Sequence, residues 1–424
     1  MHILFLTDNF PPEVNAPASR TYEHCREWVK RGHQVTVITG APNFPTGRVF
    51  PGYRNRLRAR ETMDGVEVIR VWTYIAPNER FLKRTLDFVS FMLAALPASL
   101  AVRDVDVIVA TSPQLFTPCA AYLGSLFKQR PYVFELRDLW PESIRVVGAV
   151  KSRFILGALE ALELFLYRRA AHVVSVTNAF KQDLIGRGIG AEKISVTTNG
   201  VDLSRFAPKP RDEELAARLG LSGKTVIGYV GTHGMAHGLE TILWAADRLK
   251  SEADGRDVRF LFLGDGAEKA ELKKMAAEKG LDTVIFLDSV PRGEVVRYWS
   301  LLDLAVIHLK RTALFETVIP SKLFECMAMG IPVLHGVAGE SADIVTRSQC
   351  GVLFEPENAG ELARRILELA ADPARRRELS RRGRKAAARY DRSVLAAEML
   401  QTLLDVCAPR TAAHARHRGV ERHS

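Results

Sequence analysis

The chain has 424 residues, of which 47% are hydrophobic and 25% are charged, and this length predicts two or three domains. That balance is typical of a soluble globular protein and excludes a largely disordered chain, a collagen-like chain and a small disulfide-stapled domain. Lys and Arg number 59 against 49 Asp and Glu, and the resulting net charge of +10 favours an anionic partner, either a nucleic acid, a phosphorylated ligand or a membrane surface.

Short apolar runs alternate with longer helical patterns along the whole chain. The runs are nearly continuous in Val, Ile and Leu, which predicts strands that are buried on both faces of a parallel sheet. The expected strands are 3–6, 35–38, 66–71, 105–109, 132–136 and 173–176, followed after residue 200 by 226–230, 260–263, 284–286, 304–307 and 352–354. This alternation predicts an α/β protein of two doubly wound, Rossmann-like domains that face each other across a cleft.

The expected domain boundary lies close to the prolines at 208 and 210, which deny the backbone donors that a regular element needs. We expect an N-terminal domain over 1–203 and a C-terminal domain over 204–385. A helix within 386–408 is expected to cross back to the N-terminal domain. The basic segment 409–424 shows no periodicity and is expected to be disordered.

One stretch departs from this soluble pattern. Residues 88–102, FVSFMLAALPASLAV, contain no charged side chain, and Lys83 and Arg84 precede them. They are too few to span a bilayer, which needs about 20 residues. A buried helix and a helix lying in the membrane interface, with its basic flank on anionic headgroups, both remain open. The arginine-rich segment 47–60 is a second candidate for membrane or phosphate contact, or a solvated face.

The strongest candidate site is 310–332, KRTALFETVIPSKLFECMAMGIP, which follows a predicted strand. A helix is expected to begin near Ser321 as N-cap and to end at Gly330, which suits a left-handed residue. The N-terminus of a helix binds phosphate through its unpaired N–H groups, and Lys322 in the first turn fits beside such an anion. Glu325, one turn further, can accept hydrogen bonds from ribose hydroxyls. An ordinary capped helix with a surface Lys and Glu is the alternative.

Two glycine-rich turns follow earlier strands of the second half. They are 228–238, GYVGTHGMAHG, and 264–266, GDG. Glycine lets a backbone approach an anion closely, although Asp-Gly is also common in purely structural turns. No GxGxxG pattern occurs, which argues against a dehydrogenase.

A third cluster, ELRDLWPE over 135–142, places Arg137 and Asp138 after a strand of the first half. This pair can hold a sugar or acceptor, or form a structural ion pair near a turn. The scattered cysteines and the absence of His/Cys spacing give no support for zinc, and no metal ligands are expected.

Taken together, these motifs resemble the retaining glycosyltransferases of family 4, which have the GT-B fold. The resemblance runs from residue 1 to about 405, and it looks closest to the WbuB-like subgroup that builds O-antigen and capsule polysaccharides. It is carried by FPPE, RGHQVTVIT, PNFPTGRVFPGY, ELRDLWPES, SVTNAFKQDLIGRGIGAEKISVTTNGVDLSRFAP, YVGTHGMAHGLETI, FLGDGAEK and PSKLFECMAMGIPVL.

The resemblance implies transfer of a hexosyl or N-acetylaminosugar unit from a nucleotide diphosphate donor, for which UDP is expected. It implies a retained anomeric configuration and no required metal or cofactor. The expected acceptor is a polyprenyl-diphosphate-linked saccharide of lipopolysaccharide synthesis, at the cytoplasmic face of the membrane, with no nucleic acid partner. A catalytically silent nucleotide-sugar or lipid-binding partner of an assembly complex and a sugar-nucleotide epimerase are the alternatives. The donor sugar, linkage and oligomeric state stay open.

The resemblance also assigns roles to residues. Glu325 matches the second Glu of the family's Glu–seven residues–Glu motif, and the first falls on Thr317, one place after Glu316. The family's Gly-Arg…Lys-Gly loop reads Gly231-Thr232 and His237-Gly238 here, so Lys310 and Lys322 are expected to stabilise the departing diphosphate.

The expected site residues fall into three groups. The catalytic residues are Asp138, Glu316 and Lys322. The donor-binding residues are Gly231, Thr232, His233, Gly234, His237, Gly264, Lys310, Thr317, Ser321, Lys322, Leu323 and Glu325. The acceptor residues are Pro12, Glu13, Asn15, Arg20, Arg137 and Asp138.

Overall fold

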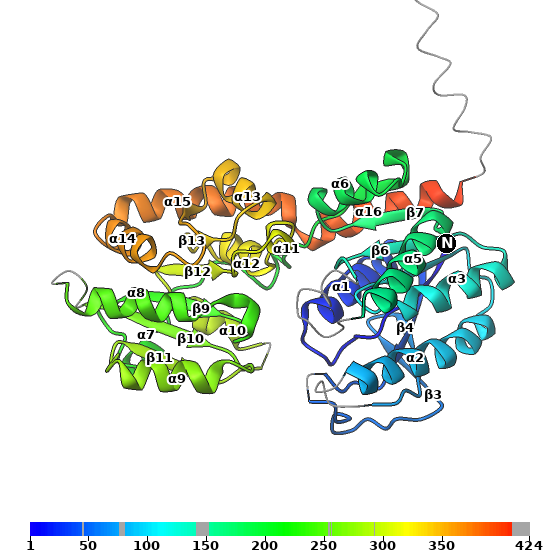
Figure 1. Cartoon of the computed structure of the whole chain (residues 1–424), viewed down its shortest axis with the longest axis horizontal. Coiled ribbons are helices and arrows are strands. Elements are labelled where there is room, and N and C mark those ends of the chain that lie inside the picture. The colour runs from blue at the N-terminus through cyan, green and yellow to red at the C-terminus, as the bar shows by residue number, and fades with distance from the viewer. Residues whose placement is uncertain are drawn as a thin grey trace, which may run out of the picture. The chain divides into compact units, whose positions relative to one another are not determined.

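The structure is a computed structural model that describes residues 1–44, 46–75, 81–140, 152–252, 255, 257–291 and 293–408, without the side chains of Phe81 and Leu82. The chain forms two compact units (Figure 1). The N-terminal unit contains Met1–Thr198 and the chain from Ser393 onward, and the C-terminal unit contains Asn199–Arg392. The segment 409–424, which the sequence predicts to be disordered, lies outside the described residues.

The boundary between the units precedes its expected position after residue 203. Val201 already belongs to the C-terminal unit, because its N–H donates to the carbonyl oxygen of Tyr390 at 2.9 Å and its own carbonyl accepts from the N–H of Arg392 at 3.0 Å. These bonds pair Val201 with the segment that leads back to the N-terminal unit.

The N-terminal unit contains an eight-stranded sheet in the order β3-β4-β2-β1-β5-β6-β7-β8. Its strands are β1 (His2–Leu6), β2 (Gln34–Gly40), β3 (Arg58–Met63), β4 (Val66–Val71), β5 (Val107–Thr111), β6 (Tyr132–Leu136), β7 (His172–Ser175) and β8 (Ile194–Val196). All neighbours are parallel except β3 and β4, so this sheet is mixed rather than wholly parallel as expected. β3 has the sequence RARETM and lies at the sheet edge. It was not predicted because its charged side chains do not form an apolar run.

Helices cover both faces of this sheet. They are α1 (Ala16–Lys30), α2 (Phe81–Ala101), α3 (Phe116–Lys128), α5 (Arg153–Arg169), α6 (Asn178–Gly186) and α16 (Arg392–Cys407), with the 3₁₀ turn η1 (Ala191–Lys193). α1 and α16 pack together, and the indole N–H of Trp28 donates to the Ala396 carbonyl at 2.8 Å. Met399 and Leu403 of α16 join the same core, so the last helix completes the N-terminal unit.

Helix α2 is buried on one face and exposed on another. Phe91, Ala95 and Ala98 face the core beneath it, whereas Leu86 and Leu93 are 57% and 63% exposed. The segment Lys83–Ala101 is the one helix of the described chain that is long and apolar enough to cross a membrane, and 28% of its apolar window is buried. One helix of this kind is weak evidence for a span, because core helices of soluble proteins have the same composition.

The C-terminal unit contains a six-stranded parallel sheet in the order β11-β10-β9-β12-β13-β14. Its strands are β9 (Thr225–Val230), β10 (Val258–Leu263), β11 (Val284–Leu287), β12 (Leu304–His308), β13 (Val333–Gly336) and β14 (Gly351–Leu353). Strand β13 was not predicted as a strand, because it has only four residues and directly follows the segment 310–332 that contains α12.

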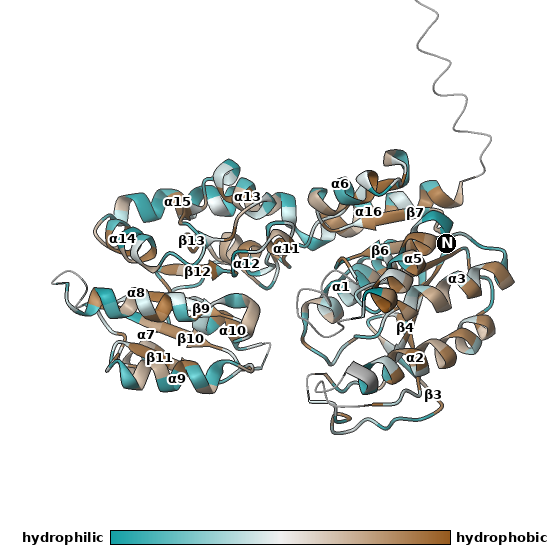
Figure 2. Cartoon of the chain, in the orientation of Figure 1, coloured by the Kyte–Doolittle hydropathy of each residue, from teal (hydrophilic) through white to brown (hydrophobic). Residues whose placement is uncertain are grey.

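The helices of the C-terminal unit are mostly short. They are α7 (Glu213–Arg218), α8 (Glu240–Lys250), α9 (Lys269–Glu278), α10 (Val295–Trp299), α11 (Ala313–Glu316), α12 (Lys322–Met329), α13 (Glu340–Ser348), α14 (Ala359–Ala370) and α15 (Pro373–Ala387), with η2 (Met235–His237) and η4 (Ala388–Tyr390). The strands carry hydrophobic side chains, whereas the arginine-rich α15 is largely hydrophilic (Figure 2).

Each sheet has one position where the strand order reverses. This position lies between β1 and β5 in the N-terminal unit and between β9 and β12 in the C-terminal unit. Loops that leave the carboxyl ends of such a pair diverge, and ligands of open α/β sheets bind in the crevice between them. The topology therefore selects the loops after β1 and β5 in one unit and after β9 and β12 in the other.

Candidate functional site

The two glycine turns of the C-terminal unit form one continuous backbone surface. The N–H of Gly231 donates to the Leu263 carbonyl at 2.9 Å, and the N–H of His233 donates to the Asp265 carbonyl at 2.8 Å. A Cβ on Gly264 would lie 1.8 Å from the carbonyl oxygen of Gly231, so this position requires glycine. The turns after β9 and β10 thus lie against each other at the carboxyl edge of the sheet.

His233 does not face this edge, in contrast with the expectation for a donor-binding side chain. Its ring is fully buried, with ring centroids 5.8 Å from Tyr229 and 6.1 Å from Phe262. Burial lowers the pKa of His233 to about 4, so the ring is neutral near pH 7. Only the backbone of His233 therefore contributes to the loop surface, because its imidazole fills the core.

Lys310 and the loop after β9 come together as the sequence predicts. The backbone N–H of Lys310 donates to the Ala236 carbonyl at 2.9 Å. Gly238 has φ of +54°, and a Cβ there would lie 3.1 Å from Cγ of Lys310. The Lys310 ammonium forms an ion pair with Glu240 at 3.4 Å. Lys310 is thus positioned as a cation beside the loop that contains Gly234 and His237.

His308 holds the same loop, and sequence reasoning did not identify it. Its ring is 2% exposed and accepts the N–H of Glu357 at Nε2, at 2.8 Å. Because Nε2 is an acceptor, the proton lies on Nδ1, which donates to the His237 carbonyl at 2.7 Å. Burial lowers the pKa of His308. The only signal in the sequence is a polar residue at the end of an apolar strand.

Helix α12 begins after Ser321 and ends at Gly330 as expected, but without the side-chain cap. Gly330 follows it with φ of +71°, whereas the hydroxyl of Ser321 accepts no capping hydrogen bond. Leu323 is completely buried, so its side chain belongs to the core and only its backbone remains at the helix start. The ammonium of Lys322 lies 3.1 Å from the nearer carboxylate oxygen of Glu325, so the two residues expected to contact diphosphate and ribose contact each other.

The two residues that compete for the first Glu position have different surroundings. The hydroxyl of Thr317 donates to the Leu314 carbonyl at 2.6 Å, which engages it within the turn after α11. The side chain of Glu316 is exposed. The carboxylate of Glu316 is therefore the more accessible of the two groups.

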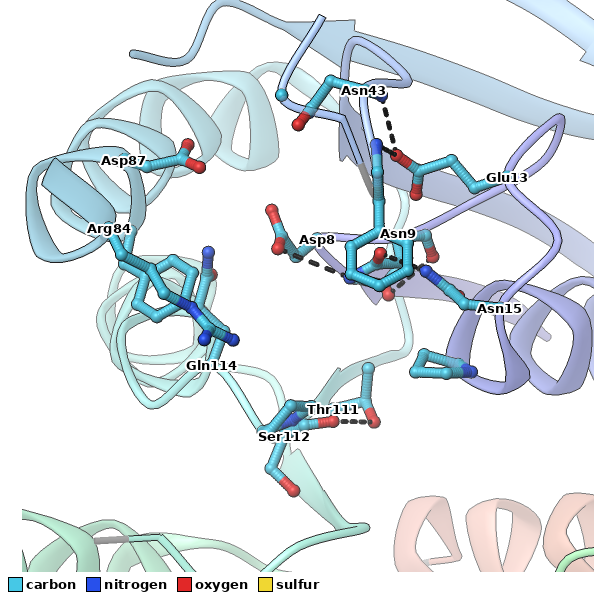
Figure 3. Close-up of a pocket in the computed structure, with 16 residues that line it drawn as sticks. Asp8, Asn9, Glu13, Asn15, Asn43, Arg84, Asp87, Thr111, Ser112 and Gln114 are labelled. Carbon is cyan, nitrogen blue, oxygen red and sulfur yellow. Dashed lines mark hydrogen bonds between the residues drawn. The ribbon is translucent and has the colours of Figure 1, made fainter. Parts of the chain in front are cut away.

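The N-terminal unit contains a pocket of about 180 Å³ at its own strand-order reversal (Figure 3). Loops after β1, β2 and β5, the start of α1 and the first turns of α2 line it. Two of the expected acceptor residues, Glu13 and Asn15, are part of this lining. Glu13 Oε1 accepts the N–H groups of Asn43 and Phe44, each at 2.8 Å, and Glu13 Oε2 is buried without a partner among the described residues.

Three charged residues of the pocket were missed by the sequence analysis. The side chains of Asp8 and Asp87 point into the same hollow, with Arg84 beside them (Figure 3). Burial, the charge of Asp87 and that of Glu13 raise the pKa of Asp8 to about 8, whereas Arg84 opposes this shift. Burial also raises the pKa of Asp87 to about 7. The rule of polar residues after strands points to Asp8, but Asp87 and Arg84 lie on a helix and give no such signal.

Arg20 is a correction to the expected acceptor set. It is 1% exposed, and its Nε lies 2.9 Å from Glu135 Oε1. Its terminal nitrogens donate to the carbonyls of Thr197 and Thr198 at 2.9 and 2.6 Å. Arg20 therefore links α1 and β6 to the segment Thr197–Thr198, where the chain leaves the N-terminal unit. It does not line the pocket.

Arg137 and Asp138 adjoin the pocket rather than line it, and Pro12, which precedes the lining residue Glu13, is not part of the lining either. The backbone N–H groups of Arg137 and Asp138 donate to the hydroxyl of Ser112, at 2.8 and 3.3 Å, and Ser112 is a lining residue. A guanidinium nitrogen of Arg137 also donates to the carbonyl of Pro17 at 3.2 Å. The segment after β6 thus contacts the pocket through the lining residues Ser112 and Pro17.

The described part of the chain contains no group of three or more His, Cys, Asp or Glu side chains arranged to hold a metal ion. The cations and helix start at the edge of the C-terminal unit are the features there that suit an anionic ligand.

Two protein-family models match the two halves of the chain. Residues 15–200 match "Glycosyl transferase 4-like domain" and residues 211–386 match "Glycosyl transferases group 1". WcaI of Escherichia coli strain K12, a glycosyl transferase assigned to colanic acid biosynthesis, is 27% identical over 78% of this chain and 82% of its own length. A GDP-mannose-dependent α-mannosyltransferase of Mycobacterium tuberculosis is 26% identical over 88% of this chain and 87% of its own length.

Solved structures show the same fold at low identity. Anabaena HepE in complex with UDP-glucose has a TM-score of 0.71 and 19% identity, covering 96% of this chain and 100% of HepE. WaaG, a glycosyltransferase involved in lipopolysaccharide biosynthesis, has a TM-score of 0.67 and 16% identity, covering 95% of this chain and 99% of WaaG. The fold is therefore GT-B, with two α/β units. The chain belongs to the glycosyltransferases that join a family-4-like N-terminal domain to a group 1 C-terminal domain.

Proposed function

We propose that this chain is a retaining glycosyltransferase of the WbuB-like subgroup. It transfers a hexosyl or N-acetylaminosugar unit from a UDP-sugar to a saccharide linked to polyprenyl diphosphate, in the synthesis of lipopolysaccharide O-antigen or capsule. The observation that carries the proposal is the carboxyl edge of the sheet in the C-terminal unit, where the glycine loop, Lys310 and the start of α12 follow strands that meet at the strand-order reversal.

Each part of this edge has a task in donor binding. The glycine loop offers backbone N–H groups, while Lys310 and Lys322 offer positive charge near the helix start. In the structure, Lys310 pairs with Glu240 and Lys322 with Glu325. A diphosphate replaces these carboxylates as the partner of both cations, and Glu325 is then released to accept hydrogen bonds from the ribose.

The reaction forms a bond between the acceptor hydroxyl oxygen and the anomeric carbon, while the bond from that carbon to the diphosphate oxygen breaks. The acceptor's proton passes to the departing diphosphate, so no protein side chain needs to act as the base. Attack on the face from which the diphosphate departs retains the anomeric configuration. Lys310, Lys322 and the start of α12 stabilise the charge that develops on the diphosphate, so we propose that no metal ion is required. Glu316 contacts the donor sugar.

The acceptor binds in the N-terminal unit, where the pocket at the end of β1 supplies carboxylate and amide groups suited to sugar hydroxyls. The exposed leucines of α2, with Lys83 and Arg84 at its start, support peripheral contact with the cytoplasmic face of an anionic membrane. Asp138 orients the donor sugar or the acceptor hydroxyl from beside the pocket.

Isothermal calorimetry with UDP and GDP, followed by transfer assays with UDP-sugars and a synthetic polyprenyl-diphosphate saccharide, tests the proposal. We expect UDP binding, transfer in the presence of EDTA and loss of transfer in Glu325→Ala. Preference for GDP contradicts the proposed nucleotide, and absence of binding to both nucleotides contradicts the function. The pairing of both candidate cations with carboxylates is the observation that favours a catalytically silent binding partner. Turnover by the wild type that is lost in Lys322→Ala excludes that alternative.

A further inference from the structure

The pocket of the N-terminal unit carries chemistry that the family resemblance does not assign. We infer that it selects acceptors by charge: it admits an uncharged, hydroxyl-bearing sugar ring and rejects a ring that carries a carboxylate or phosphate. This inference rests on the proposed function, in which this pocket receives the acceptor.

Two buried polar atoms of the pocket are left without partners by the protein itself. Glu13 and Gln114 are each 3% exposed, and Glu13 Oε2 and Gln114 Nε2 have no hydrogen-bond partner within 3.5 Å among the described residues, although the Gln114 side chain lies close enough to Asp8 to lower the pKa of that carboxyl. Buried polar groups in native proteins are almost always paired, because an unmade bond costs stability. Both residues line the pocket, so a bound ligand can supply the missing partners.

The remaining atoms of these two side chains are fixed, which defines what the ligand must offer. Glu13 Oε1 is held by the N–H groups of Asn43 and Phe44, and Gln114 Oε1 accepts from the hydroxyl of Thr117. The remaining Glu13 oxygen can therefore accept a hydrogen bond from a donor group of the ligand. The remaining Gln114 nitrogen can donate to an acceptor group of the ligand. A sugar hydroxyl supplies both functions, whereas a carboxylate or phosphate oxygen is an acceptor only.

The charge of the pocket also favours an uncharged ligand. The lining contains three carboxyl groups, from Asp8, Glu13 and Asp87, and one guanidinium, that of Arg84, while the charge of Arg70 lowers the pKa of Glu13 from outside the lining. The loops 43–47 and 112–114 add no charged residue. Burial raises the pKa of Glu13 as well as that of Asp8 and Asp87, so the acids resist becoming fully ionised together. An additional anion would increase this repulsion, whereas a neutral ring does not.

The size of the pocket also limits what enters it. Its volume of about 180 Å³ is smaller than the roughly 300–1,000 Å³ typical of sites that enclose a drug-sized ligand. One sugar ring is the appropriate scale, so the terminal residue of the acceptor enters the pocket and the diphosphate of a lipid-linked acceptor stays outside it.

The test uses the full-length chain and small glycosides as probes. Saturation-transfer NMR measures binding of the methyl glycosides of glucose, galactose, mannose and N-acetylglucosamine, and of the methyl glycuronides of the first three. We expect at least one neutral glycoside to bind and every glycuronide to bind at least about tenfold more weakly than the best neutral one, because juxtaposed like charges are strongly unfavourable. Calorimetry with UDP and GDP on the same preparation reports separately on the C-terminal unit.

Variants locate the effect in the pocket. Glu13→Gln keeps the size of the side chain and replaces the free acceptor by a donor, so it should weaken the best neutral glycoside about 10- to 100-fold. Gln114→Leu removes the amide group of the second side chain and should also weaken binding of the best neutral glycoside. It replaces Glu13→Gln as the test if that variant does not fold. The matched control is Glu192→Gln, because Glu192 is an exposed acid of the same unit outside the pocket lining. This control should bind like the wild type.

Three results overturn the inference: binding of none of the neutral glycosides, equal or stronger binding of a glycuronide, or wild-type affinity in both pocket variants. If nucleotide binding persists in any of these cases, only the charge selection by the pocket is wrong. Absence of nucleotide binding in the wild type counts against the proposed function instead.

Discussion

Replacement of His308 by Phe removes two hydrogen bonds while leaving an aromatic ring in place. The His308 ring stacks on Phe354, with centroids 5.8 Å apart and planes inclined by 8°, and a Phe ring can keep this contact. The variant loses the bonds to the His237 carbonyl and the Glu357 N–H, at 2.7 and 2.8 Å. Each loss leaves a polar group unpaired, and such a group costs about 1–3 kcal/mol.

We therefore expect the free energy of unfolding to fall by about 2–4 kcal/mol, since both bonds are only partly buried. For a unit of this size the midpoint of thermal unfolding should fall by about 5–15 °C. The loop that contains His237 belongs to the proposed donor site, so the Kd for UDP should rise about tenfold. His308→Asn is the matched variant. Its amide nitrogen can keep the bond to His237, and about half the loss is expected.

The same ring predicts a dependence on pH. Burial lowers the pKa of His308 below the 6.5 of a free imidazole. The hydrogen bond to the His237 carbonyl and the charges of Glu357 and Glu240 oppose this shift, and the charge of the His237 ring makes the smallest contribution, in the direction of burial. The unfolded chain therefore takes up the proton first. The stabilisation by neutral His308 is complete above pH 6.5 and is lost as the pH falls through the folded-state pKa. His233, His237 and His335 shift in the same direction, so the difference between wild type and His308→Phe isolates His308.

Differential scanning calorimetry from pH 5 to 8, with UDP titrations at each pH, measures both effects. If His308→Phe unfolds at the wild-type temperature and binds UDP with wild-type affinity across this range, then His308 does not hold the loop and the reasoning is wrong.

Three further predictions concern separate features of the chain. Lys322→Ala should raise the Kd for UDP about 10- to 100-fold by calorimetry, while Lys322→Arg retains most of the affinity; an unchanged Kd in the alanine variant contradicts a role in diphosphate binding. Arg20→Met should lower the unfolding free energy by about 3–5 kcal/mol in urea, because it removes the ion-pair partner of the buried Glu135 and leaves that carboxylate only Arg137 and Thr111. The double variant with Glu135→Gln should recover part of that loss, and wild-type stability of Arg20→Met would show that the pair is not needed. Replacing both Leu86 and Leu93 by Ser should weaken co-sedimentation with phosphatidylglycerol vesicles at least about tenfold without lowering the unfolding temperature, since both side chains are exposed. Unaltered sedimentation would argue that this face of α2 does not contact membrane.

The core strands were predicted because their pattern is local. A run of Val, Ile and Leu such as β1 or β9 has few alternatives to burial on both faces of a sheet, whatever surrounds it. Strands β3, β8 and β13 were not predicted, and β8 is a run of only three residues. β3 carries charged residues at a sheet edge, and β13 has only four residues directly after the segment 310–332 that was examined for a helix.

In the candidate site, too, some positions were predicted from the sequence and others were not. Lys310 was expected beside the glycine loop, because residues that follow neighbouring parallel strands meet at one edge. His233 and Arg20 have the same kind of sequence position or charge, yet both are buried. Whether a polar residue points to a ligand or into the core depends on side chains from distant strands, and no local pattern contains that information.

From the sequence by itself came the two α/β halves, the helix that ends at Gly330 and the polar segments that follow the strands, since each depends on the chemistry of neighbouring residues. Tertiary structure alone decided that Asp87 of α2 faces Asp8 at the end of β1, and that His308 joins Glu357 to the loop after β9. These pairs are far apart along the chain. Strand order and helix packing bring them together, and their charge and hydrogen bonding take effect only at that short distance.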